Sequence, residues 1–266
     1  MSSKKLGSQG TALVTGASAG IGATYADRLA KRGYDLVLVA RDAIRLEALA
    51  ADLRAHGVKV DVLPADLASA GQRDKVEQRL REDSKITLLV NNAGMSASGM
   101  FAEADLDKFD KMIALNILAL TRLAGAVLPG FLARGKGTII NLASVMALMP
   151  EMPGYAVYSA TKAFVLSFSQ SLQGETANTG VHVQAVLPGA TRTEIWERSG
   201  MDISVLPPSM VMEVGELVDA ALMGLDRGEN FTIPSLRDPA LWDGALAARA
   251  KLHPEVSRQH PAERYN

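Results

Sequence analysis

Short, almost continuously apolar runs alternate along the chain with longer stretches in which apolar residues recur every three or four positions. Such short runs are typical of strands that are covered on both faces of a parallel sheet. The seven predicted strands are Thr11–Thr15, Asp35–Ala40, Val58–Leu63, Thr87–Asn91, Thr138–Leu142, Val181–Leu187 and Phe231–Pro234.

The longer stretches predict helices. In residues 43–56, Leu46, Leu49, Ala50 and Leu53 have the spacing of a helix with one apolar face. Strands that alternate with helices predict an α/β fold, a doubly wound parallel sheet of about seven strands with helices on both faces. The predicted helices are Ile21–Lys31, Ala43–His56, Gln72–Asp83, Asp107–Arg134, Ala156–Asn178, Glu213–Arg227 and Ala240–Leu252.

No internal repeat, low-complexity tract or flexible linker interrupts this alternation, so we expect one domain over residues 1–266. The final segment, about residues 238–266, is polar and contains several prolines. We expect it to form a C-terminal extension of the domain.

Composition narrows the possible partners and the possible chemistry. The 266 residues are 48% apolar, and 28 Lys and Arg face 29 Asp and Glu, so there is no overall attraction to nucleic acid or to an anionic membrane. The chain has no cysteine, which excludes disulfides, thiolate nucleophiles and Cys-ligated metals and is consistent with a reducing cytosol.

Targeting and membrane segments are not expected. The N-terminal residues Met1–Lys5 are not followed by an apolar run, so we predict no signal peptide and a cytoplasmic protein. The longest apolar stretch, Met112–Ala133, contains Asn116, Arg122 and Pro129. It therefore predicts a buried helix and not a membrane span.

A glycine-rich turn, Thr15–Gly22 (TGASAGIG), joins the first strand to the first helix. Gly16 permits a tight turn, Gly20 lets the backbone approach a pyrophosphate, and Gly22 lets the helix pack closely on the strand. The N-terminus of the helix offers N–H groups to the phosphates. The alternative is an ordinary turn between a strand and a helix.

The end of the second strand bears on which dinucleotide is bound. An acidic residue there binds the ribose of NAD, whereas a nearby arginine accommodates the 2′-phosphate of NADP. Ala40 closes this strand and Arg41 follows it, so we predict NADP(H) in preference to NAD(H). Two alternatives stay open: Asp42 serves as the acid if the strand ends one or two residues later, or Arg41 is merely solvated.

Polar residues also follow the third and fourth strands. Asp66 is placed to accept a hydrogen bond from an adenine amino group, although capping or turn aspartates are common. The segment Asn91–Gly94 (NNAG) follows the fourth strand. Small and amide-bearing residues at the carboxyl end of a central strand lie where such sheets bind ligands.

Tyr158 and Lys162 are four positions apart and share one face of a predicted helix. A phenol ionises near pH 10, and a nearby lysine cation favours its ionised form. Tyr155 lacks such a partner, because Ser159 stands at its fourth position. This pair is a candidate proton donor and acceptor.

Two further polar residues are candidates for the same site. Ser144, just past the fifth strand, either donates to a substrate carbonyl or bonds to local backbone. Asn116 lies in an apolar helical stretch, where a buried amide needs partners. It either joins a polar network of the core or holds a water or the lysine.

These motifs, in this order, resemble those of the short-chain dehydrogenase/reductase family, over about residues 10–195. The compact length is similar to the single-domain branch of that family. The resemblance implies a Rossmann-type fold that binds one nicotinamide dinucleotide. The motifs that carry it are Thr15–Gly22, Asn91–Gly94, Asn116, Ser144, Tyr158 with Lys162, and Pro188-Gly189.

The resemblance also implies roles. Tyr158 is the general acid or base, Lys162 lowers its pKa and holds the nicotinamide ribose, Ser144 orients the carbonyl, and Asn116 joins a proton relay through water. Many NADP-dependent members carry a basic residue where this chain has Ala19, so Arg41 is the main support for NADP(H). The expected cofactor contacts are Gly16, Ser18, Ala19, Gly20, Ile21, Gly22, Arg41, Asp66, Leu67, Asn91, Ala93, Gly94, Tyr158, Lys162, Pro188, Gly189, Thr191 and Thr193, with no metal.

Residues 190–213 occupy the place of the family's variable substrate lid, and they are rich in apolar side chains, as is Val145–Met152. Because methionine fits irregular apolar shapes, we expect a lipophilic ketone or acyl substrate; the alternative is that these residues pack on the core or on another subunit. The expected activity is a carbonyl reductase or alcohol dehydrogenase, and the alternative is a non-catalytic dinucleotide-binding sensor. The family's assembly predicts a homodimer or homotetramer.

Overall fold

The computed structural model describes residues 9–199 and 202–265. The predictions for Met1–Lys5 and for Met201 lie outside these residues. The chain divides after Pro234 into two compact units. The larger unit carries the sheet and the glycine-rich turn, and each unit is described by itself below.

Seven strands form one parallel sheet in the order β3-β2-β1-β4-β5-β6-β7. The strand order therefore reverses between β1 and β4, which is the switch point where doubly wound sheets bind ligands. This architecture confirms the predicted fold class. The strands are β1 (Thr11–Thr15), β2 (Asp35–Ala40), β3 (Val60–Pro64), β4 (Ile86–Asn91), β5 (Gly137–Leu142), β6 (Val181–Val186) and β7 (Phe231–Thr232).

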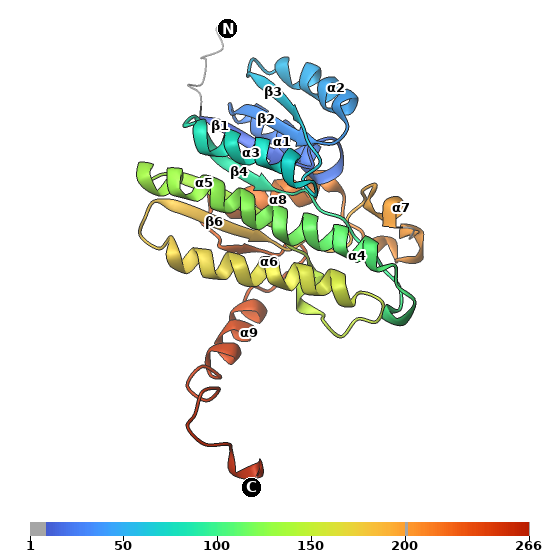
Figure 1. Ribbon diagram of the computed structural model, residues 1–266, viewed down its shortest axis with the longest axis vertical. Helices are drawn as coiled ribbons and strands as arrows, with labels where there is room; N and C mark the ends of the chain where they lie inside the picture. Colours follow the sequence, from blue (N-terminus) through green and yellow to red (C-terminus); the bar gives the residue numbers. More distant parts are fainter. Residues whose placement is uncertain (1–8, 200–201, 266) are drawn as a thin grey trace. The chain divides into compact units, whose positions relative to one another are not determined.

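Helices cover both faces of this sheet (Figure 1). Helices α1, α2 and α8 pack through their apolar residues on one face, and α3, α5 and α6 pack on the other. Alternate residues of each strand enter the two cores: Leu13 belongs to one and Val14 to the other. The helices are α1 (Gly20–Lys31), α2 (Ala43–Arg54), α3 (Ala70–Glu82), α4 (Leu106–Ile113), α5 (Leu120–Arg134), α6 (Ala156–Glu175), α7 (Ile195–Ser199) and α8 (Val214–Asp226).

Several element boundaries differ from the prediction for identifiable reasons. Helix α6 ends at Glu175 because Asn178 has a left-handed backbone, with φ of 64°. Strand β3 begins at Val60 because its register with β2 pairs Val60 with Leu36. Strand β7 is only two residues long, and the prediction of a strand that reaches Pro234 was wrong, since proline cannot donate to the ladder.

The long helix predicted for residues 107–134 is not uniform. A π-helical turn, Ala114–Ala119, separates α4 from α5. Together the three segments form a 29-residue helix, Leu106–Arg134, that is long and apolar enough to cross a membrane. That criterion alone is weak, because the core helix of a globular protein also meets it, and α5 packs through Leu123, Val127 and Phe131 on the sheet.

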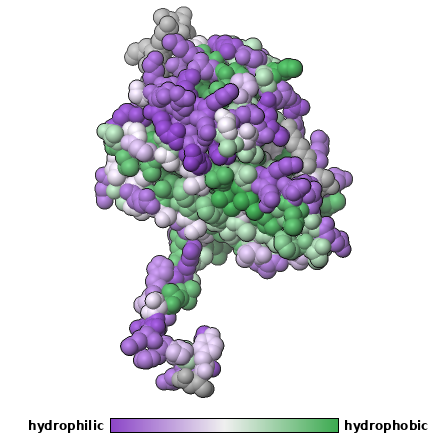
Figure 2. Space-filling model, viewed as in Figure 1, coloured by the Kyte–Doolittle hydropathy of each residue, from purple (hydrophilic) through white to green (hydrophobic). Residues whose placement is uncertain are grey.

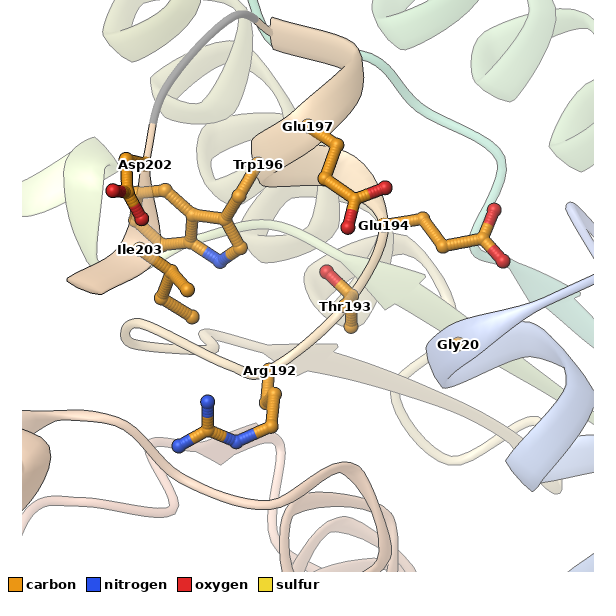
Figure 3. A pocket seen from close by; sticks show the side chains of 8 residues that line it. All are labelled: Gly20, Arg192, Thr193, Glu194, Trp196, Glu197, Asp202 and Ile203. Atoms are coloured by element: carbon orange, nitrogen blue, oxygen red, sulfur yellow. The ribbon is translucent and has the colours of Figure 1, made fainter.

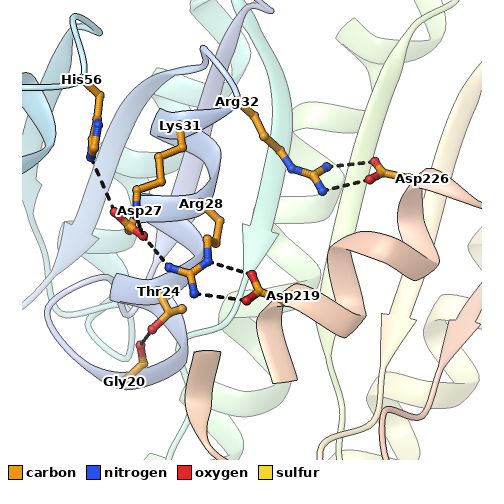
Figure 4. A network of polar contacts seen from close by, with 9 residues as sticks. All are labelled: Gly20, Thr24, Asp27, Arg28, Lys31, Arg32, His56, Asp219 and Asp226. Carbon is orange, nitrogen blue, oxygen red and sulfur yellow. Dashed lines mark hydrogen bonds and ion pairs between the residues drawn. The ribbon is translucent and has the colours of Figure 1, made fainter. Parts of the chain in front are cut away.

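Ion pairs fix α1 against α8 (Figure 4). Arg28 donates to Asp219 at 2.7 Å, and Arg32 donates to Asp226 at 2.8 Å. Such partly exposed pairs add little stability individually. Their effect here is to orient α1, the helix that follows the glycine-rich turn.

The smaller unit, residues 235–265 as described, contains α9 (Ala240–Ala250) and a short 3-10 turn, Glu263–Tyr265. None of its described residues is buried, and Leu241, Leu252 and Val256 are exposed. The unit therefore has no core of its own.

Candidate active site

The glycine-rich turn adopts the backbone that only glycine tolerates well. Gly16 and Gly20 have φ of 65° and 53°. A Cβ on Gly16 would lie 2.8 Å from Nδ2 of Asn92, and a Cβ on Gly22 would collide with the carbonyl oxygen of Gly16. Glycine at these two positions therefore lets the turn pack against β4 and α1 begin directly beside it.

Helix α1 begins at the end of this turn. Its N-cap residue is Ala19, and no side chain among the described residues caps it. The first N–H groups of α1 are thus left to a ligand, and the positive end of the helix dipole favours a diphosphate there. Ser18 and Ile21 are half-buried beside these groups, and Ile21 packs on the core.

Thr15 connects the turn to β4. Its hydroxyl donates to the carbonyl oxygen of Val90 at 3.1 Å and accepts from the backbone N–H groups of Asn92 and Ala93, both at 2.9 Å. The amide of Asn92 in turn donates to the carbonyl oxygen of Thr15 at 2.8 Å. Thr15 and Asn92 were not predicted as site residues, although both lie within motifs that were.

The end of β2 matches the prediction. The strand ends at Ala40, and Arg41 is exposed directly after it. Asp42 caps α2 by accepting from the N–H of Arg45 at 3.0 Å. The alternative in which Asp42 closes a longer strand was therefore wrong, and Arg41 is left as the charged residue at the strand end.

The loop after β3 is a hydrogen-bonded turn. Oδ1 of Asp66 accepts from the N–H of Ala68 at 3.1 Å, and the N–H of Asp66 donates to Gln72 at 2.8 Å. Leu67 is buried. The turn role, one of the two alternatives for Asp66, is thus observed, and it leaves Oδ2 of Asp66 to a ligand.

Asn91 closes β4 and is buried. Its amide nitrogen donates to Oδ1 of Asn141 at 3.0 Å, whereas its own Oδ1 has no hydrogen-bond partner in the part of the chain that the structure describes. Thr15, Leu67 and Ala93 lie around Asn91. The glycine-rich turn, the uncapped α1 and this unpaired amide oxygen fit a dinucleotide at the switch point.

Tyr158 and Lys162 lie together on α6, as predicted. Nζ of Lys162 is 5.9 Å from the centre of the Tyr158 ring and donates to the carbonyl oxygen of Leu142, at the end of β5, at 2.8 Å. Lys162 is only 7% exposed. The phenol ring packs against the small apolar cluster of Phe109 and Met112.

Burial controls the ionisation of both groups. Burial raises the pKa of Tyr158, and this outweighs the hydrogen bond with Ser144, which lowers it. Burial also lowers the pKa of Lys162 to about 8. At neutral pH the phenol is therefore protonated, and it can donate a proton.

Ser144 connects β5 to the segment after β6. Its hydroxyl lies 3.4 Å from the carbonyl oxygen of Pro188 and accepts from the N–H of Met146 at 3.2 Å. Beyond Pro188, the hydroxyl of Thr191 donates to the carbonyl oxygen of Gly189 at 3.1 Å. The structure thus brings Ser144, Tyr158 and the Pro188–Thr191 segment together at the carboxyl ends of β5 and β6.

Asn116 lies in the π-helical turn and is fully paired. Its Oδ1 accepts from the N–H of Met95 at 2.9 Å, and its amide nitrogen donates to Met95 and Thr161 at 2.9 and 3.1 Å. A Cβ on Gly94 would lie 3.3 Å from Oδ1 of Asn116 and 3.7 Å from Nζ of Lys162. Asn116 and Gly94 therefore lie next to Lys162.

The segment after β6 leads from the glycine-rich turn to a cavity of about 690 Å³ (Figure 3). The methyl group of Thr193 faces Gly20, and the indole of Trp196 donates to the carbonyl oxygen of Thr191 at 2.8 Å. Charged side chains line the cavity beside apolar ones, which the apolar composition of residues 190–213 did not indicate. The lining consists of Gly20, Arg192, Thr193, Glu194, Trp196, Glu197, Asp202 and Ile203.

Apolar side chains are exposed near Tyr158. The N–H of Gly99 donates to the carbonyl oxygen of Gly154 at 3.0 Å, so the loop after β4 meets the loop before α6. Met100 and Phe101 on the first of these segments and Leu148 and Met152 on the second are exposed. We call these four residues the apolar rim; Figure 2 shows apolar side chains gathered over the α4–α6 part of the molecule.

Comparison with known proteins identifies the family. The family model for short chain dehydrogenases matches residues 10–203. The chain therefore belongs to this family, which confirms the resemblance carried by its motifs.

Similar proteins include two with solved structures and one curated relative. A short-chain dehydrogenase from Sphingobium yanoikuyae in complex with NADPH is 54% identical, with a TM-score of 0.93 over 96% of this chain and 100% of that one. A bulky-bulky ketone specific alcohol dehydrogenase from Comamonas testosteroni is 48% identical, with a TM-score of 0.89 over 98% and 99%. A very-long-chain 3-oxoacyl-CoA reductase from Anas platyrhynchos is 41% identical over 192 residues; the chain spans 60% of that relative and matches it over 69% of its own length.

Proposed function

We propose that the protein is an NADP(H)-dependent oxidoreductase that interconverts a carbonyl group and a secondary alcohol on a lipophilic ketone or acyl substrate. The observation that carries this proposal is the grouping of Tyr158 with the buried Ser144 and Lys162 at the carboxyl end of the sheet. The alternative of a non-catalytic sensor has no comparable support, since this set is complete.

Three residues of the chain have separate roles in the proposed reaction. The hydroxyl of Ser144 donates a hydrogen bond to the substrate oxygen, and the protonated phenol of Tyr158 transfers its proton to that oxygen as the alcohol forms. The ammonium of Lys162, held by Leu142, stabilises the phenolate that remains and holds the nicotinamide ribose. A nicotinamide cofactor held at this site would provide the hydride chemistry at the carbonyl carbon.

Asn116 lies beside Lys162, across Gly94. Because its amide is anchored on Met95 and Thr161, the π-helical turn is held beside the lysine. We assign to Asn116 the role of holding a water that relays protons between Lys162 and solvent. Its Oδ1, which already accepts from Met95, has a second lone pair for that water.

The cofactor assignment rests on the glycine-rich turn and on Arg41. The NADPH complex of the Sphingobium protein supports NADP(H). An exposed arginine directly after β2 pairs with a 2′-phosphate through charge-assisted hydrogen bonds. Removal of Arg41 by Arg41→Ala is expected to lower kcat/KM for NADPH by roughly 10- to 100-fold and to leave that for NADH unchanged, and an unchanged NADPH/NADH preference would refute the assignment.

The substrate assignment rests on the apolar rim and on the similar proteins. Met100, Phe101, Leu148 and Met152 leave apolar surface exposed, and Phe101 stacks on Phe109, which packs with Tyr158. The Comamonas protein is specific for bulky-bulky ketones, and the Anas relative is a reductase of very-long-chain 3-oxoacyl-CoA. The cavity that Trp196 lines would take a different part of the ligand.

A direct test is the loss of NADPH absorbance with a panel of ketones matched in their reactive group. The proposal predicts that ketones with long or bulky apolar substituents turn over faster than small charged ones. Faster turnover of the small charged ketones would refute the substrate class. No turnover of any ketone or aldehyde, with NADPH still bound, would refute the reaction and favour a sensor.

We also propose a cytoplasmic homodimer or homotetramer. Exposed apolar side chains on the α4–α6 part, Ile113, Leu118, Leu132 and Phe164, support contact between copies there. Light scattering during gel filtration measures the assembly, and a monomer at micromolar concentration would refute it.

A further inference from the structure

A buried arginine holds the loop that carries Asp66 and Leu67. Arg73, in the first turn of α3, is 5% exposed, and its Nη1 donates to the carbonyl oxygen of Leu67 at 3.1 Å. Gln72, one residue earlier, accepts from the N–H of Asp66 at 2.8 Å. Two consecutive side chains of α3 therefore fix both residues of this loop.

Arg73 is itself kept in place by Glu77. The Glu77 side chain is 1% exposed, and its Oε1 lies 3.6 Å from Nε of Arg73. Glu77 also accepts from Arg122 on α5 at 2.7 Å and from Arg81 at 2.6 Å. Burial alone would raise the pKa of Glu77, but the hydrogen bonds from Arg122 and Arg81 outweigh it and lower the pKa, so the carboxylate stays ionised.

Stability alone does not account for Arg73. Burying a guanidinium costs free energy, and apolar side chains of similar size often replace buried ion pairs without loss of stability. Nε of Arg73 has no hydrogen-bond partner within the described ranges. Among the described residues, the hydrogen bond of the buried cation goes to the carbonyl oxygen of Leu67.

The position of that carbonyl matters to the cofactor site. Leu67 lies beside Asn91 and Ala93 at the carboxyl end of β4, and Asp66 has Oδ2 left after Oδ1 accepts from Ala68. A rotation of the peptide after Leu67 would move both the leucine side chain and the turn that orients the carboxylate. The loop is thus preorganised from α3 before any ligand binds.

We propose that Arg73 is a positioning residue for the adenine end of the cofactor, and that Glu77 holds it in that role. The proposal rests on the proposed NADP(H) binding. Arg73 acts through Leu67 and Asp66 and does not touch the reacting atoms. A merely structural role, as a clip between α3 and α5, would leave adenine binding unchanged.

The test is Arg73→Met, which keeps the apolar length of the side chain and removes the guanidinium. Arg79→Met is the matched control, because Arg79 lies on the same helix and pairs with Asp61 and Asp83, away from Leu67. Calorimetry with adenosine 2′,5′-bisphosphate measures the adenine half alone. Steady-state kinetics separates KM for NADPH from kcat.

Arg73→Met is expected to lower the affinity for the bisphosphate by roughly 10-fold, which is the effect of losing one hydrogen bond from a charged donor. It is also expected to raise KM for NADPH by a similar factor and to leave kcat unchanged. Arg79→Met is expected to change neither. Unchanged affinity in Arg73→Met, or an equal loss in Arg79→Met, would overturn the proposal. If Arg73→Met does not fold, Arg73→Lys takes its place. Its affinity for the bisphosphate is also expected to be weaker than that of wild type, and an unchanged affinity would overturn the proposal.

The wild-type protein separates this proposal from the one on which it rests. If wild type binds neither NADPH nor the bisphosphate, the proposed function is wrong and Arg73 has no such role. If wild type binds both and Arg73→Met binds them equally well, only the positioning role is wrong.

Discussion

Nζ of Lys162 lies 5.9 Å from the centre of the Tyr158 ring, with its hydrogen bond directed to the carbonyl oxygen of Leu142. No carboxylate within residues 9–199 and 202–265 forms an ion pair with Lys162. Its charge is therefore not neutralised by the protein. The ammonium of Lys162 is therefore available to stabilise a phenolate at Tyr158 by electrostatic attraction.

The buried ammonium makes stability depend on pH. Burial lowers the pKa of Lys162 from 10.5, the ordinary value for a lysine, to about 8, so the unfolded chain holds this proton more tightly than the folded one. Burial of the charge therefore costs stability in full below about pH 8, and the cost disappears as pH rises to about 10.5. The lowering corresponds to a free energy on the order of 3 kcal/mol.

Lys162→Met removes this cost at every pH. Lys162→Met is expected to exceed wild type in free energy of unfolding by the largest amount below pH 8. That difference is expected to shrink by about 3 kcal/mol between pH 8 and pH 10.5. Urea unfolding at several pH values measures the difference. Lys136→Met, at an exposed position, controls for the loss of a lysine, and a difference from wild type that does not vary with pH in Lys162→Met would contradict the account.

The glycine-rich turn predicts a contrast between two glycines. Gly22→Ala puts a methyl group against the carbonyl oxygen of Gly16, so we expect a loss of about 1–3 kcal/mol in stability and of measurable NADPH binding. Gly71→Ala, in α3, meets no atom within 4 Å and is expected to be neutral or to stabilise by up to about 1 kcal/mol. Thermal unfolding measures the stability of both variants, and calorimetry measures their NADPH binding. If Gly22→Ala still binds NADPH, this prediction is wrong.

An ion pair ties the segment after β6 to α2. Nη1 of Arg45 lies 2.9 Å from both carboxylate oxygens of Glu194, and next to Glu194 the methyl group of Thr193 faces Gly20. This contact therefore fixes the segment that lies against Gly20 of the glycine-rich turn. Both partners are about half exposed, so the pair adds little to stability.

Glu194→Gln is expected to lower the affinity for NADPH by up to about fivefold at low salt. It is expected to have little effect at high salt, because the ion pair is screened there. Glu197→Gln removes the same charge from the same cavity lining and is the control. Fluorescence titration with NADPH at two salt concentrations measures both variants. An equal loss in the control, or a loss that high salt does not reduce, would show that the pair with Arg45 is not the cause.

The parts of the fold and site that depend on local sequence could be predicted. The strand, glycine-rich turn and helix from Thr15 to Gly22 follow one another directly, and the four-residue spacing of Tyr158 and Lys162 fixes their common helix face. The doubly wound parallel sheet follows from the alternation of strands and helices and from the handedness of crossovers.

The parts that depend on distant partners could not be predicted. Glu77 and Arg122 are 45 positions apart, and Arg45 and Glu194 are 149 apart, and no periodic pattern relates such charges. The start of β3 depends on its register with β2. The π-helical turn depends on the bonds of Asn116 to Met95 and Thr161, which lie 21 and 45 positions away.

The central claim is that Tyr158 transfers the proton while the rest of the site binds the cofactor. Tyr158→Phe removes only the phenolic oxygen, so the site should still bind NADPH with a Kd within about twofold of wild type. Loss of general acid catalysis is expected to lower kcat for ketone reduction by roughly 100- to 10,000-fold. If Tyr158→Phe instead reduces the ketone at the wild-type rate with NADPH bound, the proton comes from elsewhere and the account is wrong.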